Sequence, residues 1–165
     1  MLGDSITAYV DWDELLGRTD IAGRGIGGDT TAGFLNRLHY VFKLNPRICF
    51  IMGGINDISR GIPVDEIFEN YKNIITNLKN HNIIPIIQST LYTSNPIWNR
   101  EVEKLDELLK RYAEDNNVDY IDLNGFLSEE RALKEEYTYD GVHLLGNAYE
   151  VWRQAIKNIL KKHSL

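Results

Sequence analysis

The chain has 165 residues and a net charge of −6, with 43% hydrophobic and 25% charged residues. This composition is typical of one globular domain, residues 1–165, that is long enough to bury a core. Nucleic acids and anionic membranes attract clustered Lys and Arg, so the acidic balance argues against both as partners. No segment reaches the roughly 18 consecutive apolar residues of a membrane span.

The only cysteine is Cys49, so no internal disulfide bond can form. Cys49 lies in the apolar run Ile48–Met52, which favours a buried structural thiol over a nucleophile. The lone thiol and the polar start Met1–Asp4 are typical of a cytoplasmic protein. No second histidine or cysteine stands at metal-ligand spacing, so we expect neither a metal nor another cofactor.

Short apolar runs alternate along the chain with stretches of helical periodicity. Only Met1 and Leu2 precede Gly3, so a truncated first strand is expected. The long strand runs are almost continuously apolar, as in strands covered on both faces. The alternation predicts a parallel α/β sheet with helices on both faces and with sites at the carboxyl ends of its strands. The predicted elements are, in order, a strand at Asp20–Ala22, a helix after Asp29, a strand at Arg47–Met52, a helix opened by Pro63, a strand at Ile83–Ser89, a helix from Asn99, a strand at Val118–Asp122 and a helix from about Asn147 to Lys162.

The segment Gly3–Thr7 follows the short first strand. Glycine permits a sharp turn there, which would place Ser5 at the start of the next helix. A serine in this position either caps the helix or acts as a nucleophile whose developing charge the helix dipole favours. Taken by itself, the segment favours the capping role.

A glycine-rich loop, Gly23–Thr31, contains the pattern Gly-x-Gly-x-x-Gly from Gly23 to Gly28. In dinucleotide-binding proteins this pattern follows a firm strand, and an acidic residue stands roughly 20 positions further on. The preceding strand is weak here, and Phe42–Met52 contains no Asp or Glu, so a nucleotide site is disfavoured. The loop instead offers backbone N–H groups to a developing anion.

The segment Gly53–Asp57 directly follows the strand with the strongest apolar pattern. Its glycines allow close approach of the backbone, and Asn56 presents a neutral amide donor at the end of the strand. The alternative is an Asn/Asp turn that hydrogen-bonds to its own backbone, and the segment alone favours this alternative.

Asp140 and His143 stand three residues apart. At this spacing the carboxylate can accept the Nδ1–H of the imidazole and leave Nε2 facing outward, which fixes the tautomer that a general base needs. None of the other three histidines has a carboxylate at the same spacing. The four segments together supply a nucleophile, two oxyanion donors and an oriented base at successive strand ends.

In chain order, these segments resemble the blocks of the SGNH (GDSL-type) hydrolase family over essentially the whole chain. The matching stretches are Gly-Asp-Ser-Ile from Gly3, Gly-Gly-Asp-Thr from Gly27, Gly-x-Asn-Asp from Gly54 and Asp-x-x-His from Asp140. The stretch Gly25–Thr31 is similar to the branch that contains platelet-activating-factor acetylhydrolase catalytic subunits and bacterial sugar-ester deacetylases.

The resemblance implies a flavodoxin-like three-layer α/β/α sandwich. It also implies that Ser5 is the nucleophile and that Asp140 and His143 complete a catalytic triad. The backbone N–H groups of Ser5 and Gly28 and the side chain of Asn56 would form the oxyanion hole.

We expect hydrolysis of short, acetyl-type esters of sugars or small alcohols through an acyl-enzyme, because no long insertion is available to form a lid or tunnel. A lysophospholipase or thioesterase of the same family is the alternative, and a non-catalytic carbohydrate-binding module is the alternative from another class. A homodimer is a further possibility, because exposure of Trp152 or an unpaired edge of the first strand could drive dimerisation. The candidate pocket walls are Trp12, Tyr92, Ile97 and Trp98, the last three around the loop Thr93–Pro96.

Overall fold

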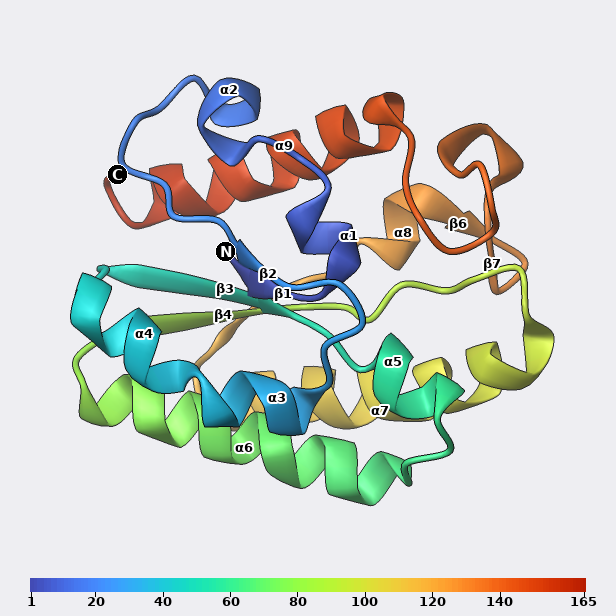
Figure 1. The fold of residues 1–165 in the computed structure, drawn as a ribbon, viewed down its shortest axis with the longest axis horizontal. Helices are drawn as coiled ribbons and strands as arrows, with labels where there is room; N and C mark the ends of the chain where they lie inside the picture. Colours follow the sequence, from blue (N-terminus) through green and yellow to red (C-terminus); the bar gives the residue numbers. More distant parts are fainter.

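The computed structural model describes residues 1–165. At its centre is a five-stranded sheet in which all neighbouring strands are parallel, in the order β2-β1-β3-β4-β5 (Figure 1). The parallel direction brings the five carboxyl ends to one edge of the sheet. The strands are β1 (Leu2–Gly3), β2 (Arg24–Gly25), β3 (Ile48–Met52), β4 (Ile84–Gln88) and β5 (Asp119–Ile121).

Helices cover both faces of this sheet, which confirms the expected three-layer α/β/α sandwich (Figure 1). One face carries α1 (Ser5–Ala8), α2 (Trp12–Leu16), α8 (Asn124–Leu127) and α9 (Gly146–Lys162). The opposite face carries α3 (Thr31–Asn36), α4 (Leu38–Leu44), α5 (Ile55–Ser59), α6 (Val64–Asn80) and α7 (Pro96–Asp115). A small antiparallel hairpin, β6 (Ser128–Glu129) and β7 (Ala132–Leu133), and a 3₁₀ turn, η1 (Glu135–Tyr137), precede the last helix.

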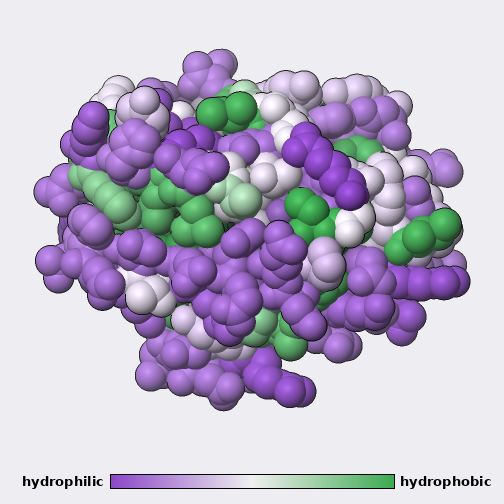
Figure 2. Space-filling model, turned by 60° about the horizontal axis from the view of Figure 1, so that its bottom comes forward, coloured by the Kyte–Doolittle hydropathy of each residue, from purple (hydrophilic) through white to green (hydrophobic).

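A single apolar cluster of 38 buried residues fills the space between the layers. The α6 helix shows how the sequence builds it, because its apolar residues recur at the helical period and face the sheet. Its outward side belongs to a surface that is mostly hydrophilic (Figure 2). No helix of the structure combines the length and the apolar character needed to cross a membrane. The buried residues of α6 are Val64, Ile67, Tyr71, Ile74, Ile75 and Leu78.

Most predicted elements are present with small shifts at their ends. The strands predicted within Arg47–Met52, Ile83–Ser89 and Val118–Asp122 are confirmed as β3, β4 and β5. The α7 helix begins at Pro96, three residues before the predicted start, because the Asn95 side chain accepts hydrogen bonds from the first N–H groups of the helix.

The strand predicted at Asp20–Ala22 is wrong, because the second strand is Arg24–Gly25 and pairs with Leu2 and Gly3. An edge strand pairs with only one neighbour and needs no apolar run, so the polar sequence of β2 gives no pattern from which the strand could be predicted. The first strand has only two residues but lies centrally, between β2 and β3. It therefore has no free edge, and Trp152 is fully buried, so neither feature that favoured a homodimer is present.

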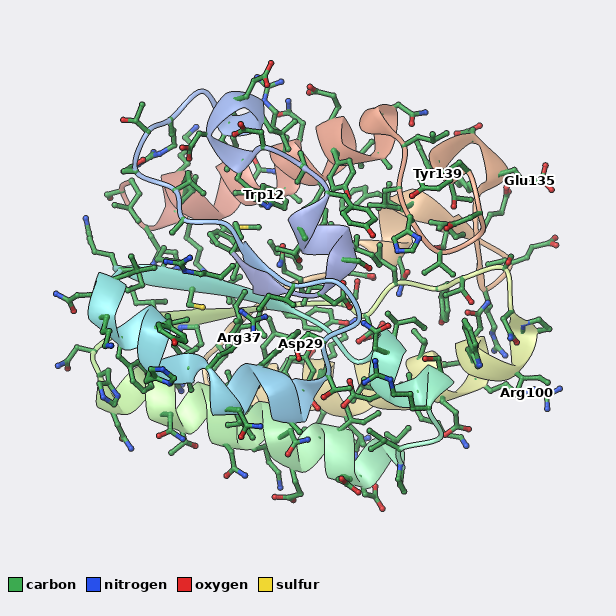
Figure 3. The ribbon with its side chains drawn as sticks, in the orientation of Figure 1. Trp12, Asp29, Arg37, Arg100, Glu135 and Tyr139 are labelled. Atoms are coloured by element: carbon green, nitrogen blue, oxygen red, sulfur yellow. The ribbon has the colours of Figure 1, made fainter.

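The helix expected after Asp29 is divided in two. Arg37 ends α3 and precedes α4, with φ −110° and ψ 9°, outside helical geometry. The Arg37 side chain turns back toward the carboxyl edge of the sheet, where it lies beside Asp29 (Figure 3).

Candidate active site

Ser5 lies at the carboxyl end of β1 and is the first residue of α1. The helix cap is Asp4, whose Oδ1 accepts a hydrogen bond of 2.9 Å from the Ile6 N–H. The Asp4 side chain accepts from the N–H of Ile6 and not from that of Ser5, and the Ser5 N–H has no protein partner. A Cβ on Gly3 would lie 2.0 Å from Thr7 Oγ1, so the tight turn into the helix requires glycine.

The base predicted from the Asp-x-x-His spacing is in contact with Ser5. His143 Nε2 lies 2.9 Å from Ser5 Oγ, across 138 positions of sequence. On the other side of the ring, His143 Nδ1 lies 2.6 Å from Asp140 Oδ2. Both distances are within hydrogen-bonding range, so the three side chains form a continuous chain of the kind that activates a serine hydroxyl.

Asp140 is held in place by the backbone that follows it. Its Oδ1 accepts hydrogen bonds of 2.9 Å from the Val142 N–H and 2.7 Å from the His143 N–H. Desolvation acts to raise the pKa of Asp140, but the hydrogen bonds from His143 and Val142 outweigh it and lower the pKa. The carboxylate therefore stays ionised and keeps the Nδ1 proton of His143 on its own side of the ring.

The loop that carries this pair is fastened at two further points. Thr138 Oγ1 donates to the His143 carbonyl at 2.6 Å and accepts from the Gly141 N–H at 2.9 Å. The Ser94 N–H donates to the Gly141 carbonyl at 2.8 Å. The loop Thr93–Pro96 therefore lies against the loop that carries Asp140 and His143, as the sequence predicts.

The other two expected oxyanion donors are Gly28, in the loop after β2, and Asn56, in the first turn of α5. Gly28 has φ +73°, a conformation that favours glycine, and its N–H has no protein partner. Asn56 Nδ2 donates to the Asp29 carbonyl at 2.9 Å, which fixes the amide and leaves its second N–H free. The Gly28 carbonyl is held by Arg60 Nη2 at 2.6 Å. The N–H groups of Ser5, Gly28 and Asn56 are thus all available to a developing anion.

A buried network behind these loops joins them to each other. Asp57 is fully buried and accepts hydrogen bonds from the Thr31 N–H and, at 2.6 Å, from Thr31 Oγ1. Asn70 Nδ2 also contacts Thr31 Oγ1 at 2.9 Å. Burial raises the pKa of Asp57, and the Thr31 hydrogen bonds oppose the rise. The sequence motifs named Asp57 only as the neighbour of Asn56 and did not reveal this role.

Asp4 brings a second buried carboxyl close to the reacting atoms. Only 1% of the residue is exposed, and its Oδ2 has no hydrogen-bond partner. Burial raises the pKa of Asp4 to about 6, against the Ile6 hydrogen bond and the attraction of His143, which lower it. An ionised Asp4 would favour positive charge on His143, the charge that the base acquires during proton transfer.

Two exposed tyrosines, Tyr9 and Tyr139, flank His143, and no sequence motif marks either of them as part of the site. The Tyr9 ring stacks on the His143 ring with centroids 5.2 Å apart, and the Tyr139 ring does so at 6.0 Å. They are 60% and 62% exposed, and Figure 3 shows Tyr139 on the segment that leads into α9. Tyr139 directly precedes Asp140 in the sequence, which is the one signal that could have indicated it. Tyr9 has no such signal.

The four residues expected to form pocket walls lie in different surroundings. Trp12 is buried in the core against Tyr149 and Trp152 (Figure 3), so its assignment to a pocket wall is corrected. Its apolar ring is covered by α9, and its Nε1 donates to the Thr7 carbonyl. Tyr92 lines a separate polar hollow with Asp106 and Arg131.

Ile97 and Trp98 remain near the loop that contacts Gly141. Ile97 is 69% exposed at the first turn of α7, and Trp98 packs partly against the core. An apolar pocket of about 300 Å³ lies elsewhere, at the amino ends of β1 and β3, and none of its lining residues belongs to the triad. The candidate triad therefore lies at the carboxyl edge of the sheet, whereas this pocket lies at the opposite edge.

Known proteins resemble this chain over most of its length. A curated relative, the N-acylneuraminate cytidylyltransferase of Streptococcus agalactiae serotype V, is 28% identical over 81% of this chain but only 34% of its own length. The chain thus spans about a third of that protein. The isoamyl acetate-hydrolyzing esterase of Saccharomyces cerevisiae is 23% identical over 90% of this chain and 72% of its own.

Among solved structures, a GDSL-like lipase from Bacteroides thetaiotaomicron superimposes with a TM-score of 0.90, at 26% identity over 98% of this chain and 86% of its own. The GDSL-like Lipase/Acylhydrolase family matches residues 1–151, a range that includes Ser5, Asn56, Asp140 and His143. The chain therefore belongs to the GDSL-like lipase/acylhydrolase family.

Proposed function

We propose that the protein is a serine esterase that transfers the acyl group of short carboxylic esters first to Ser5 and then to water. The observation that carries the proposal is the unbroken chain from Ser5 Oγ to His143 Nε2, 2.9 Å, and from His143 Nδ1 to Asp140 Oδ2, 2.6 Å. A hydroxyl becomes a competent nucleophile when a positioned base accepts its proton in this way.

In the first half-reaction, His143 accepts the Ser5 proton while Oγ attacks the ester carbonyl. The tetrahedral oxyanion is stabilised by the N–H groups of Ser5 and Gly28 and by the Asn56 amide. The C–O bond to the alcohol then breaks, His143 donates its proton to the departing oxygen, and the acyl-enzyme remains. In the second half-reaction, water replaces the alcohol, and the same groups act in the reverse order to release the acid.

Two observations support a short acyl group. The segments that join β2 to α3 and β3 to α5 have only five and two residues, Ile26–Thr30 and Gly53–Gly54. The yeast relative is named for hydrolysing an acetate ester. We therefore expect higher kcat/KM for p-nitrophenyl acetate than for p-nitrophenyl octanoate. A preference for the octanoate would refute the short acyl group and favour a lysophospholipase-like or thioesterase-like activity.

The position of the base indicates where the alcohol lies. His143 must return its proton to the leaving oxygen, so the alcohol lies against His143, beside the exposed rings of Tyr9 and Tyr139. Flat rings with polar hydroxyls suit the mixed polar and apolar faces of a sugar or small alcohol better than a long lipid chain. Acetylated sugars and alkyl acetates, compared in wild type and Tyr139→Ala, test this. An equal loss on both substrate classes would refute a specific role for the ring.

Fluorophosphonate labelling separates the esterase from a carbohydrate-binding module without activity. We expect stoichiometric labelling of the wild type and none of Ser5→Ala. Ser164→Ala, which removes an exposed hydroxyl near the C-terminus, is the matched control and should label normally. Labelling that persists in Ser5→Ala would exclude Ser5 as the nucleophile.

A further inference from the structure

Arg37 forms hydrogen bonds with three separate segments at the carboxyl edge of the sheet. Its Nε donates to Asp29 Oδ2 at 2.7 Å, its Nη1 to the Arg24 carbonyl at 2.8 Å and its Nη2 to the Gly3 carbonyl at 2.8 Å. The side chains of Arg37 and Asp29 are only 14% and 15% exposed, and they lie side by side in Figure 3. The ion pair is therefore partly desolvated and directional.

These contacts connect all three oxyanion donors. Gly3 stands two residues before Ser5, whose N–H is one donor. Asp29 directly follows Gly28, the second donor, and the Asp29 carbonyl accepts the amide of Asn56, the third. The three donors otherwise come from separate segments that follow β1, β2 and β3: Ser5 begins α1, Gly28 lies in a loop and Asn56 lies in α5. Each of the three donors thus lies within two residues of a group that Arg37 binds, or is joined to such a group by one hydrogen bond.

The backbone of α3 is shaped to receive the same carboxylate. A Cβ on Gly33 would lie 1.7 Å from Asp29 Oδ1, so only glycine leaves room for it. Asp29 Oδ1 also accepts a hydrogen bond of 3.0 Å from the Thr30 N–H. The Arg37 guanidinium lies over the Phe34 ring, 5.2 Å from its centroid. Gly33, Phe34 and Arg37 thus hold Asp29 in one position.

We propose that Arg37 is a positioning residue of the oxyanion hole, which fixes the Ser5 N–H, the Gly28 N–H and the Asn56 amide relative to one another. The proposal rests on the esterase function above. Oxyanion donors act only when they are preorganised around the developing charge, so small shifts of one loop weaken the transition state more than the bound substrate. A planar fork with donors in three directions is needed, and lysine cannot supply it.

The test compares Arg37→Met and Arg37→Lys with Arg18→Met. Arg18 is a matched control, because it also pairs with an aspartate, Asp20, but at an exposed site away from the triad. With p-nitrophenyl acetate, we expect Arg37→Met to lower kcat by about 10- to 100-fold with KM changed by less than about threefold. Arg37→Lys should be intermediate, and Arg18→Met should resemble the wild type.

A double variant shows whether Arg37 acts through the oxyanion hole. Once Arg37→Met has displaced the donors, adding Asn56→Ala should reduce kcat far less than it does in the wild type. The proposal would be overturned if the fold-losses in kcat of Arg37→Met and Asn56→Ala multiplied fully in the double variant. It would also be overturned by an unchanged kcat in both Arg37 variants, or by a rise in KM alone. If Arg37→Met does not fold, Gly33→Ala, which expels the Asp29 carboxylate, replaces it in the same comparison. Gly146→Ala is its control, since a Cβ there meets open space.

Hydrogen exchange separates this proposal from the esterase function. Backbone amides of residues 26–31 should exchange faster in Arg37→Lys than in Arg18→Met, and equal rates would overturn the positioning role. A wild-type protein that neither hydrolyses esters nor reacts with a fluorophosphonate would refute the esterase function. The exchange rates would still decide whether Arg37 holds the loop.

Discussion

Asp4→Asn should make the protein more stable and less active. Asn keeps the Oδ1 acceptor that caps α1 through the Ile6 N–H. It removes a carboxylate that is 1% exposed and has an unpartnered Oδ2. Ionised Asp4 therefore destabilises the folded state, while its charge favours the imidazolium of His143 during catalysis. A buried charge retained at a functional position is expected to reduce stability in return for activity.

The magnitude follows from the pKa of Asp4. Burial raises this pKa from its ordinary value of 3.8 to about 6, so the folded state binds the proton more tightly than the unfolded chain does. Stability is then lost as the pH rises through this interval, and the penalty is complete above it. Each unit of pKa corresponds to about 1.4 kcal/mol, so the penalty is about 3 kcal/mol near pH 8 and about 1 kcal/mol near pH 4.5.

Urea denaturation at these two pH values measures the effect. Asp4→Asn should have a higher free energy of unfolding than the wild type at both pH values. This gain should be about 2 kcal/mol larger at the higher pH than at the lower pH. Asp11→Asn is the matched control, because Asp11 also caps a helix but is exposed, so its substitution removes no buried charge. An equal gain at both pH values, or a loss near pH 8, would contradict a buried, ionised Asp4.

Three further variants test separate parts of the site. Asn56→Ala should lower kcat by about 10²- to 10³-fold, as loss of one oxyanion donor does, and near-normal turnover would remove Asn56 from the hole. Asp140→Asn should lower kcat by up to about 10⁴-fold in steady-state ester hydrolysis, because an amide supports the wrong tautomer of His143; a loss below about tenfold would contradict the triad. Tyr71→Phe should destabilise the protein by about 1–3 kcal/mol in urea titrations, because it leaves the buried Gly53 N–H without its 2.9 Å partner. An unchanged midpoint would show that another group replaces the hydroxyl.

The predictable part of the fold is the part that apolar burial dictates. β3 and β4 are almost wholly apolar and buried, so their apolar runs predict them as strands. α6 and α9 repeat apolar residues at the helical period, which predicts them as helices. The β2 strand has two residues, Arg24 and Gly25, and its pairing is decided by the neighbouring strand β1. A local pattern carries no information about this pairing, so the sequence predicts the strand at Asp20–Ala22 instead of at Arg24–Gly25.

The candidate site divides in the same way. Asp140 and His143 interact across one turn, so their spacing revealed them, and the rule for parallel sheets placed Ser5 and Asn56 at the same edge. Arg37, Tyr9 and the buried role of Asp57 depend on contacts between distant segments. The Arg37 pattern in particular is invisible locally, because a lone arginine in a helical stretch is usually a solvated residue.

Burial explains how three carboxyls of the candidate site can have different roles. Asp140 is partly exposed and receives three hydrogen bonds, which lower its pKa, so it remains charged and orients His143. Asp57 is buried but its carboxylate accepts hydrogen bonds from Thr31, and it joins α5 to the start of α3. Asp4 is buried with one oxygen unpartnered, so its charge is unfavourable in the folded state and acts most strongly on its neighbour. The same low-dielectric surroundings that make an ionised Asp4 destabilising also strengthen its attraction for the imidazolium of His143, so stability and rate should change in opposite directions at this one position.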